Sequence, residues 1–444
     1  MPSPEALAPE ELVTFVTTDL AAITRGRSVA RSDLARAMGK GVGWVPANLA
    51  LTPFGDIASP NPFGSEGDLR LMPDPQAGVR VAGLPGVTPL HYHHADLLTL
   101  DRQPWEGCLR SILKAAVAAL EVEAGLRIIA AFEHEFCLLD TGRPSGQPFA
   151  LSKQRAADPF GPLLVAALRE AGCAPEVFLP EYGADQFEVV CAPAGAVAAA
   201  DRAVNIREIS REVARLSGGR ASFSPRISEG GVGNGVHIHL SLTDLDGNPI
   251  THDPDQPGEL SRRAGQFFAG IIRHMQALTA FCAPTKISYT RLQPHLWSAA
   301  WTTLGERDRE ATLRICPVST RPGDDPAHSY NVEFRAADAT ASPHLSLAVL
   351  IRAGLEGLRD ELASPPIVRG DPGEMTQAER DALGVRRLPG SMAEALAAIE
   401  ADATVRGWFT HTFMDCYLAM KRKEAELVAD LDGQALCDRY AEIY

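Results

Sequence analysis

The chain has 444 residues, of which 45% are hydrophobic and 22% charged, so it is long enough for two globular domains with substantial cores. Its 42 basic and 56 acidic residues give a formal net charge of −14, which disfavours non-specific binding to nucleic acid or to an anionic membrane. No apolar stretch reaches the roughly 20 residues of a membrane span, and the first residues carry no secretory-signal pattern.

Residues 1–104 are expected to form one small domain and residues 105–444 a larger one. In the first domain, a helix is predicted from Pro9–Phe15 onward, followed by short strands and a stretch rich in proline and glycine at 52–89. The segment 102–104 is interpreted as the linker between the two domains.

The larger domain is predicted to be α+β, with a mainly antiparallel sheet backed by helices. Helices and strands are intermingled in the sequence without a steady βαβα rhythm, which argues against a parallel sheet. Helical periodicity of apolar residues is good in six segments: Cys108–Val122, Ala198–Leu216, Leu260–Ala280, Leu345–Leu358, Met392–Ile399 and Thr404–Leu431.

The eight cysteines are widely spread and form no CxxC pair: Cys108, Cys137, Cys173, Cys191, Cys282, Cys316, Cys416 and Cys437. Disulfides or a zinc site would give some of them a function. The spacing favours instead buried, reduced thiols in a cytoplasmic protein.

Paired carboxylates interrupt two predicted strands of the larger domain. In the strand Arg127–Leu139, Glu133 and Glu135 are two residues apart and project from the same face, inside an otherwise apolar run. Buried like charges are costly unless a cation neutralises them, whereas an exposed edge strand would hold two glutamates without any function. Glu188 lies in the strand-like QFEVV, and Glu181 precedes it by seven residues across a turn.

Two further predicted strands carry polar pairs. His237 and His239 share one face of a strand that follows a glycine-rich loop, in which the backbone can approach a ligand closely. Glu333 and Arg335 share a face of NVEFR, where a salt bridge within the sheet would explain them equally well. The segment between these strands supplies three arginines that would otherwise be surface charges: Arg291, Arg309 and Arg314.

Together these strands place five glutamates and two histidines on predicted inward faces. A donor set rich in carboxylates suits Mg²⁺ or Mn²⁺ rather than zinc, which prefers cysteine and histidine. Two such ions with nearby arginines are what phosphoryl transfer from ATP requires, because that reaction depends on positioning and charge neutralisation.

The succession EHE, EYGADQFE, GNGVHIHLS, RLQP, ERDREATLR and NVEFR resembles the glutamine synthetase family in order and spacing, from about residue 10 to the C-terminus. Each motif alone is only moderately specific, but six in sequence are a strong match, and GSEGDLRLMPDP is similar too. The resemblance implies a small β-grasp N-terminal domain and a large catalytic domain. It also implies a homododecamer of two stacked hexameric rings, with active sites between subunits.

The resemblance assigns roles to single positions. One metal ion would be bound by Glu135, Glu181 and Glu188, and a second, beside the ATP phosphates, by Glu133, His237 and Glu333. Positions on the nucleotide side match His239, Ser241 and Arg314, and positions that bind glutamate match Gly233, Arg291 and Arg335. Arg309 matches a position on the transferred phosphate, so Arg309 and Arg335 are the expected catalytic residues.

The implied reaction has two steps. ATP phosphorylates the γ-carboxylate of glutamate, which gives a γ-glutamyl phosphate, and an amine nitrogen then displaces the phosphate. Arginines and metal ions would spread the charge of the transferring group, and a closed site would keep water from the acyl phosphate.

One departure from the family bears on the amine. True glutamine synthetases have a glutamate three residues after the proline of RLxP, and this chain has Trp297 there. Tryptophan cannot act as a base, but it offers an apolar face for a substrate. No clear match exists for the family's N-terminal aspartate, although Thr52 or Asp56 occupies that region. Both changes resemble the branch that makes γ-glutamyl amides from polyamines, ethanolamine, alkylamines or anilines, unless Trp297 only packs and another loop supplies the base.

Other departures bear on the acid substrate and the nucleotide. Val232 stands where an asparagine assists glutamate binding in the family, and His328 and Asn331 replace basic residues near the nucleotide. Three alternatives to an amine ligase therefore stay open. They are an ammonium-using glutamine synthetase, a catalytically silent structural member of the fold, and a metal-dependent hydrolase, in which HxH strands also occur.

Overall fold

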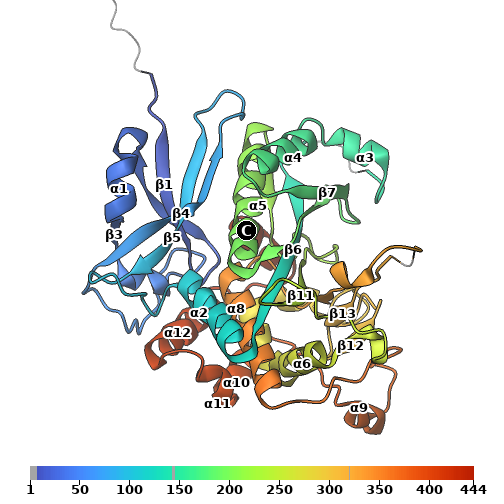
Figure 1. Cartoon of the computed structure of the whole chain (residues 1–444). Helices are drawn as coiled ribbons and strands as arrows, with labels where there is room; N and C mark the ends of the chain where they lie inside the picture. The colour runs from blue at the N-terminus through green and yellow to red at the C-terminus, as the bar shows by residue number, and fades with distance from the viewer. Residues whose placement is uncertain (1–7, 143–145, 320) are drawn as a thin grey trace, which may run out of the picture.

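A computed structural model describes residues 8–142, 146–319 and 321–444 (Figure 1). Residues 1–7, which the predicted N-terminal domain includes, lie outside the described residues. Two sheets organise the chain, with strand orders β2-β1-β5-β4-β3 and β12-β13-β14-β11-β6-β8-β7, and β9 and β10 also pair with β6. Every pairing is antiparallel except β1 with β5 and β12 with β13. The predicted α+β class with a mainly antiparallel sheet is confirmed.

The strands are β1 (Leu12–Thr18), β2 (Thr24–Ala30), β3 (Val42–Trp44), β4 (Leu69–Val81), β5 (Leu90–Leu98), β6 (Leu126–Leu139), β7 (Pro175–Pro180), β8 (Gln186–Cys191), β9 (Ala194–Gly195), β10 (Arg220–Ser222), β11 (Val236–Asp244), β12 (Leu304–Glu306), β13 (Leu313–Ile315) and β14 (Val332–Phe334).

The helices are α1 (Leu34–Lys40), α2 (Leu109–Ala124), α3 (Leu151–Ala156), α4 (Phe160–Glu170), α5 (Ala196–Leu216), α6 (Arg262–Cys282), α7 (Ser288–Arg291), α8 (Pro343–Arg359), α9 (Gln377–Leu383), α10 (Met392–Ala401), α11 (Ala403–Arg406), α12 (His411–Leu427) and α13 (Gly433–Ala441).

The helix predicted from Pro9–Phe15 onward is wrong, because this segment forms β1. It is rich in β-branched residues, which pack well in strands, and Val13 and Phe15 are fully buried on one face. β1 pairs with β2 along its whole length and with β5 in parallel, so tertiary pairing overrides the short apolar spacing that suggested a helix.

The helix predicted at Thr404–Leu431 is also wrong in part, since it divides into α11 and α12. The break follows Gly407, and the side chain of Thr410 then accepts a hydrogen bond from the Phe413 N–H and caps α12. The other five predicted helices are confirmed as α2, α5, α6, α8 and α10.

Strand β6 runs through the middle of the large sheet and presents two different faces. Ile128, Ala130, Phe132 and Phe136 alternate along one face and are buried where α2 and α5 pack on the strand (Figure 1). The residues between them, which include Glu133 and Glu135, face the opposite side. The helices therefore fix the strand from behind and leave its polar face free for a site.

A buried ionic network joins the two domains at Arg110 of α2. Its guanidinium donates to Asp201 of α5 at 2.9 Å and, in the small domain, to Asp74 at 2.8 Å and Asp96 at 3.0 Å. His344, at the start of α8, contacts the Asp201 carboxylate at 2.8 Å. Burial alone would raise the pKa of Asp201, but His94, His344 and Arg110 hold it well below its usual range.

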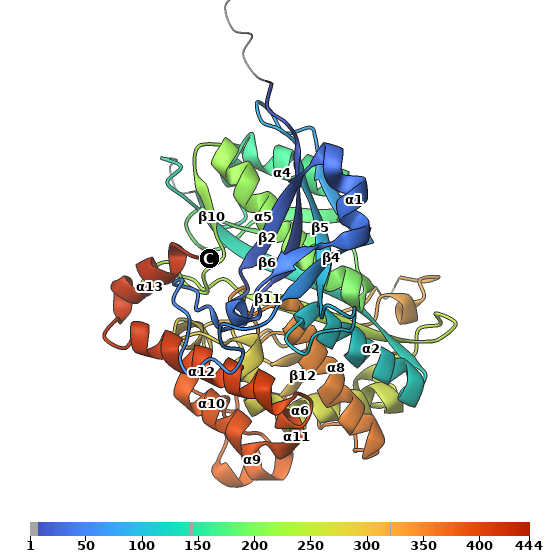
Figure 2. The same ribbon diagram turned by 90° about the vertical axis from the view of Figure 1, so that its left-hand side faces the viewer.

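The C-terminal segment returns to the small domain. Helices α12 and α13 run along one side of the molecule in Figure 2, and the hydroxyl of Tyr444 donates to the Ala21 carbonyl at 2.7 Å. Tyr440 and Tyr444 are buried against Ala22 and Ile287, so the end of the chain closes a second, smaller apolar cluster.

All eight cysteines are buried and none forms a disulfide, as predicted. Among the described residues, no helix combines the length and the apolar character that a bilayer span needs.

The interdomain network leads to a stability prediction. Arg110→Met leaves the buried Asp201 carboxylate without the guanidinium that pairs with it, and such losses cost about 3–5 kcal/mol. We expect a clearly lowered melting temperature in scanning calorimetry. Arg215→Met is the matched control, since it removes an exposed pair with Glu212 worth less than about 1 kcal/mol. Equal melting temperatures for the two variants would contradict a role for Arg110 in joining the domains.

Candidate active site

The strand register of the large sheet aligns charged side chains in a row. Glu188 of β8 lies opposite Glu135 of β6, and Glu133 of β6 lies opposite His237 of β11. The row continues with His239 opposite Glu333 of β14, which in turn lies opposite Arg314 of β13. Cross-strand partners are separated by about 4.5–5.5 Å at Cβ, so the row forms one continuous polar band.

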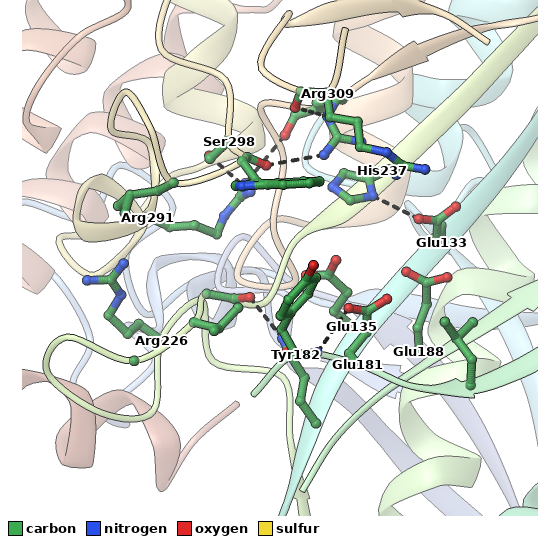
Figure 3. A pocket seen from close by; sticks show the side chains of 18 of the residues that line it. Glu133, Glu135, Glu181, Tyr182, Glu188, Arg226, His237, Arg291, Ser298 and Arg309 are labelled. Carbon is green, nitrogen blue, oxygen red and sulfur yellow. Dashed lines mark hydrogen bonds and ion pairs between the residues drawn. The ribbon is translucent and has the colours of Figure 1, made fainter. Parts of the chain in front are cut away.

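Five residues of this band line a cavity of about 680 Å³: Glu133, Glu135, Glu188, His237 and Arg314. Two predicted site residues of the band, His239 and Glu333, are not part of the described cavity lining. Most of the predicted site residues line the cavity: Glu133, Glu135, Glu181, Glu188, Gly233, His237, Arg291, Trp297, Arg309, Arg314 and Arg335. In Figure 3 the carboxylates of Glu133, Glu135, Glu181 and Glu188 gather on one side of the cavity, and Arg226 and Arg291 lie on the other.

Three of these carboxyl groups have no salt-bridge partner among the described residues. Within the described parts of the chain, Glu135, Glu181 and Glu188 form no salt bridge, although Glu135 accepts a hydrogen bond from the Gly235 N–H at 2.6 Å. Burial and the nearby Glu135 raise the pKa of Glu181 to about 7. Burial, with Glu133 and Glu135 close by, also raises the pKa of Glu188. A bound cation would reverse both shifts, so this donor set fits a hard divalent ion.

The second predicted metal set, Glu133, His237 and Glu333, differs from the first because its carboxylates are paired with cationic or hydrogen-bonding side chains. Glu333 is 1% exposed, and its carboxylate accepts from Arg314 at 2.8 Å and from Arg335. Burial would raise the pKa of Glu333, but His237 and Arg335 lower it to about 2. The salt bridge considered for Glu333 and Arg335 is therefore present, alongside contacts of His237 with Glu333 at 3.4 Å and with Glu133 at 3.0 Å.

Ligand atoms of Glu133, His239 and Glu333 lie within 4.8 Å of one another, which is close enough for one ion. Burial opposes the charge of Glu133, but hydrogen bonds with His237 and His239 lower its pKa well below the ordinary value. The geometry thus brings His239 to the metal side of the site as well as His237. The resemblance assigns His239 to the nucleotide side.

Arg335 contributes chiefly by holding other groups. Its guanidinium donates to Glu333, to the Arg309 carbonyl at 2.9 Å and to the Trp297 carbonyl at 3.2 Å. Arg291 is equally constrained, since it donates to the Ala337 carbonyl at 2.6 Å. The guanidiniums of Arg226 and Arg309, in contrast, have no partner among the described residues and are available to an anionic ligand.

Trp297 is presented by a short loop with unusual backbone geometry. His295 and Trp297 have positive φ angles of 62° and 54°, a conformation that side chains rarely adopt. The Glu310 carboxylate accepts from both backbone N–H groups, at 3.1 and 3.3 Å, and so holds the loop in place. The Trp297 side chain is 62% exposed and lines the cavity, so it does not serve merely as core packing.

Sequence reasoning missed several cavity residues. Phe149 and Tyr182 line the cavity, are 51% and 53% exposed, and have ring centroids 5.0 Å apart. Tyr182 lies 6.1 Å from the Trp297 ring, so three aromatic side chains from separate segments form one wall. Only Tyr182 carried a signal, because it directly follows Glu181. Arg226 was missed because its position in the cavity depends on how distant segments pack.

Some predicted residues lie elsewhere. Ser241 is two residues beyond His239 on β11 and, with Thr52 and Asp56, is outside the described cavity lining. Thr52 and Asp56 hydrogen-bond to each other within a loop of the small domain.

Near the predicted nucleotide side, Asn331 contacts His239 Nδ1 at 2.9 Å, whereas His328 is largely exposed. Val232 lines the cavity.

Comparison with known proteins adds a family context. The glutamine synthetase catalytic domain matches residues 106–435, and the glutamine synthetase N-terminal domain matches residues 4–105. A gamma-glutamylpolyamine synthetase of Streptomyces coelicolor is 34% identical over 437 residues, which cover 96% of this chain and 92% of that protein.

Two further relatives are also glutamine synthetases or their homologs. A glutamine synthetase of Thermococcus kodakarensis is 33% identical over 311 residues, 68% of each chain. The crystal structure of a glutamine synthase homolog is 47% identical, with a TM-score of 0.91, and the match covers 99% of this chain and 100% of that one.

The raised carboxyl pKa values predict how pH affects the metal-free protein. Glu181 has a pKa of about 7 when folded and an ordinary value of 4.5, so the folded state binds more protons between these values. Stability of the metal-free protein therefore falls as pH rises through this window. We expect the melting temperature to decrease from pH 5 to pH 7.5, and the increase on adding Mg²⁺ to be larger at the higher pH.

Glu181→Gln is the matched variant, because it keeps the shape of the side chain and cannot ionise. Its melting temperature should depend less on pH over the same range. A pH dependence equal to that of the unsubstituted protein would show that other groups cause the effect.

Proposed function

The chain belongs to the glutamine synthetase family of ligases, and from this premise we propose that it joins the γ-carboxylate of glutamate to an amine larger than ammonium, with ATP converted to ADP and phosphate. The convergence of four cavity carboxylates with Arg309 and Arg335 carries the proposal, since phosphoryl transfer needs this charge arrangement. The intermediate would be a γ-glutamyl phosphate.

Two Mg²⁺ or Mn²⁺ ions and ATP are the proposed cofactors; when bound, they would neutralise charge and supply the phosphoryl group. Glu135, Glu181 and Glu188 would bind one ion, and Glu133, His237 and Glu333 the other. The raised pKa values of Glu181 and Glu188, which form no salt bridge in the described parts of the chain, support this assignment. Arg309 would contact the phosphoryl oxygens with its unpaired guanidinium, and Arg314 would do so beside Glu333.

Glutamate is the proposed acid substrate. Gly233 lies beside Arg291, where a Cβ would come within 2.6 Å of the arginine side chain, so only glycine leaves the backbone open at this point. The unpaired guanidinium of Arg226 adds positive charge at the same end of the cavity (Figure 3). This charge suits an α-carboxylate even though Val232 supplies no amide.

The aromatic wall of Phe149, Tyr182 and Trp297 supports an amine with an apolar substituent. Its exposed rings adjoin the charged site, because Tyr182 follows Glu181 and the Trp297 carbonyl is bound by Arg335. Trp297 cannot accept a proton, so an amine that is neutral near pH 7, such as an aniline, requires least from the protein.

A polyamine is less well accommodated. Its distal ammonium groups would need carboxylates, and the four acidic residues that line the described cavity all belong to the proposed metal sets. The relative named for polyamines supports an amine ligase in general, whereas the wall favours alkyl or aryl amines.

We further propose a cytoplasmic protein that assembles as a homododecamer of two stacked hexameric rings, with active sites between subunits, as the family does. The unpaired thiols fit that location, and light scattering in solution would test the assembly.

Glu188→Gln separates metal binding from folding. Because Glu188 retains its proton without metal, the neutral glutamine should leave the metal-free melting temperature unchanged or raise it. It should also abolish most of the Mg²⁺-dependent stabilisation and lower ligase turnover at least about 100-fold. Glu212→Gln, on the surface, is the control. Full Mg²⁺-dependent activity in Glu188→Gln would exclude the proposed metal set.

An amine panel tests the substrate class. ADP release with glutamate and ammonium, butylamine, benzylamine, aniline or spermidine should give the highest kcat/KM for the apolar amines, with product masses as confirmation. Trp297→Ala should lower kcat/KM for benzylamine about tenfold, equal to about 1.4 kcal/mol, and change the value for ammonium little. Trp297→Phe should retain most activity.

Three other results of the amine panel would contradict parts of this proposal. A preference for ammonium would support glutamine synthesis, and a preference for spermidine would contradict the role given to the aromatic wall. Turnover without ATP would favour the hydrolase alternative.

A further inference from the structure

Lys153 of α3 is a buried lysine beside the candidate active site. Its side chain is 2% exposed and is not part of the described cavity lining. Its ammonium donates to the Glu181 carbonyl at 2.5 Å and to the Gly183 carbonyl at 2.6 Å, and it lies 5.8 Å from the centre of the Phe187 ring. No salt bridge joins it to a carboxylate in the described chain. Because burial of an unpaired charge is costly, the contacts with the two carbonyls are what compensates for it.

The turn that Lys153 binds carries two residues that face the cavity. Glu181 belongs to the proposed metal set that also contains Glu135 and Glu188, and Tyr182 belongs to the aromatic wall. The two carbonyls that accept from the ammonium lie on either side of Tyr182 in the chain. One buried charge therefore fixes the backbone that presents both a metal ligand and an aromatic ring.

The chain around Lys153 reaches the same turn by a second contact. Phe149 lies four residues earlier, and its ring meets the Tyr182 ring edge-on with the centroids 5.0 Å apart. A Cβ at Gly146 would come within 2.6 Å of the Lys153 Cβ, so the backbone there packs closely against the base of the lysine side chain. The lysine stem is thus directed at the turn by its own segment.

We propose that Lys153 is a positioning residue, which holds the turn so that Glu181 faces the metal ion and Tyr182 faces the amine. This role rests on the proposed function, since it uses that metal set and that aromatic wall. The ammonium also attracts the Glu181 carboxyl group from outside the cavity. It therefore offsets part of the negative charge and leaves the position of the cation open.

Metal binding and amine binding should weaken together when the ammonium is removed. Lys153→Met keeps the aliphatic stem and frees both carbonyls of the turn. Binding of Mn²⁺ to the full chain, followed by the electron paramagnetic resonance of free Mn²⁺, should become about tenfold weaker, as for other groups that orient a metal ligand. The KM for benzylamine should rise and the KM for glutamate should change little, because Gly233 and Arg291 do not contact this lysine.

Lys153→Gln is the second variant, in case methionine impairs folding. Its amide can donate to one of the two carbonyls, so its Mn²⁺ affinity and its KM for benzylamine should lie between those of the unsubstituted protein and Lys153→Met.

Lys421→Met is the matched control for loss of a buried lysine. Lys421 is fully buried in α12, pairs with Glu424 at 2.9 Å, and is outside the described cavity lining. Its replacement should lower the melting temperature, because Glu424 is left buried and unpaired. The Mn²⁺ affinity and the KM for benzylamine should stay unchanged. A loss of stability alone is thereby separated from a loss of positioning.

Unchanged Mn²⁺ affinity in both Lys153 variants would overturn the proposal, and so would an equal loss of affinity in Lys421→Met. The Mn²⁺ measurement does not depend on turnover. If no amine is converted but Mn²⁺ affinity depends on Lys153, the positioning role stands for the metal ligand and the proposed ligase reaction fails. If benzylamine is converted and both Lys153 variants keep the original Mn²⁺ affinity and KM, the reaction stands and the positioning role fails.

Discussion

Uncompensated carboxylates on the face of β6 and β8 are the constraint on which the whole site depends. Glu135 and Glu188 are cross-strand neighbours, and Glu181 adds a third carboxyl group with no salt bridge in the described chain. Repulsion of this kind destabilises a folded protein unless protons or cations are bound. The helices behind β6 supply the rigidity that holds these groups together, so binding of a cation recovers stability that the protein alone lacks.

At the other end of this row, on the same face of the sheet, the buried carboxylate is paired with arginines. Glu333 is compensated permanently by Arg314 and Arg335, and its pKa of about 2 keeps it ionised. Charge therefore changes along the row of strands, from free carboxylates at β8 to paired carboxylate and arginine at β13 and β14.

Sequence patterns predicted the parts of this site that depend on local spacing. Glu133 with Glu135 and His237 with His239 share faces because a strand repeats every two residues. Which strands are neighbours was not predictable locally, so the pairing of Glu188 with Glu135, and of Glu333 with Arg314, needed the structure. Phe149 was missed for the same reason. In the small domain, the segment of β1 was mistaken for a helix because a short run of apolar residues fits either period, and one of the two strands that pair with it, β5, lies 78 residues further along the chain.

Arg335 connects the proposed amine end of the cavity to the proposed phosphate end. One guanidinium binds the Glu333 carboxylate, the Arg309 backbone and the Trp297 carbonyl. The position of the aromatic wall therefore depends on the ion pair that also sets the charge of the metal site. A substituted Arg335 would shift Trp297 and Glu333 together, so specificity and turnover cannot be altered separately at this residue. The Trp297 side chain is not part of this ion pair, because Arg335 and Glu310 bind only the Trp297 backbone. The indole is thus the part of the site where a change of amine requires no change in the charge arrangement.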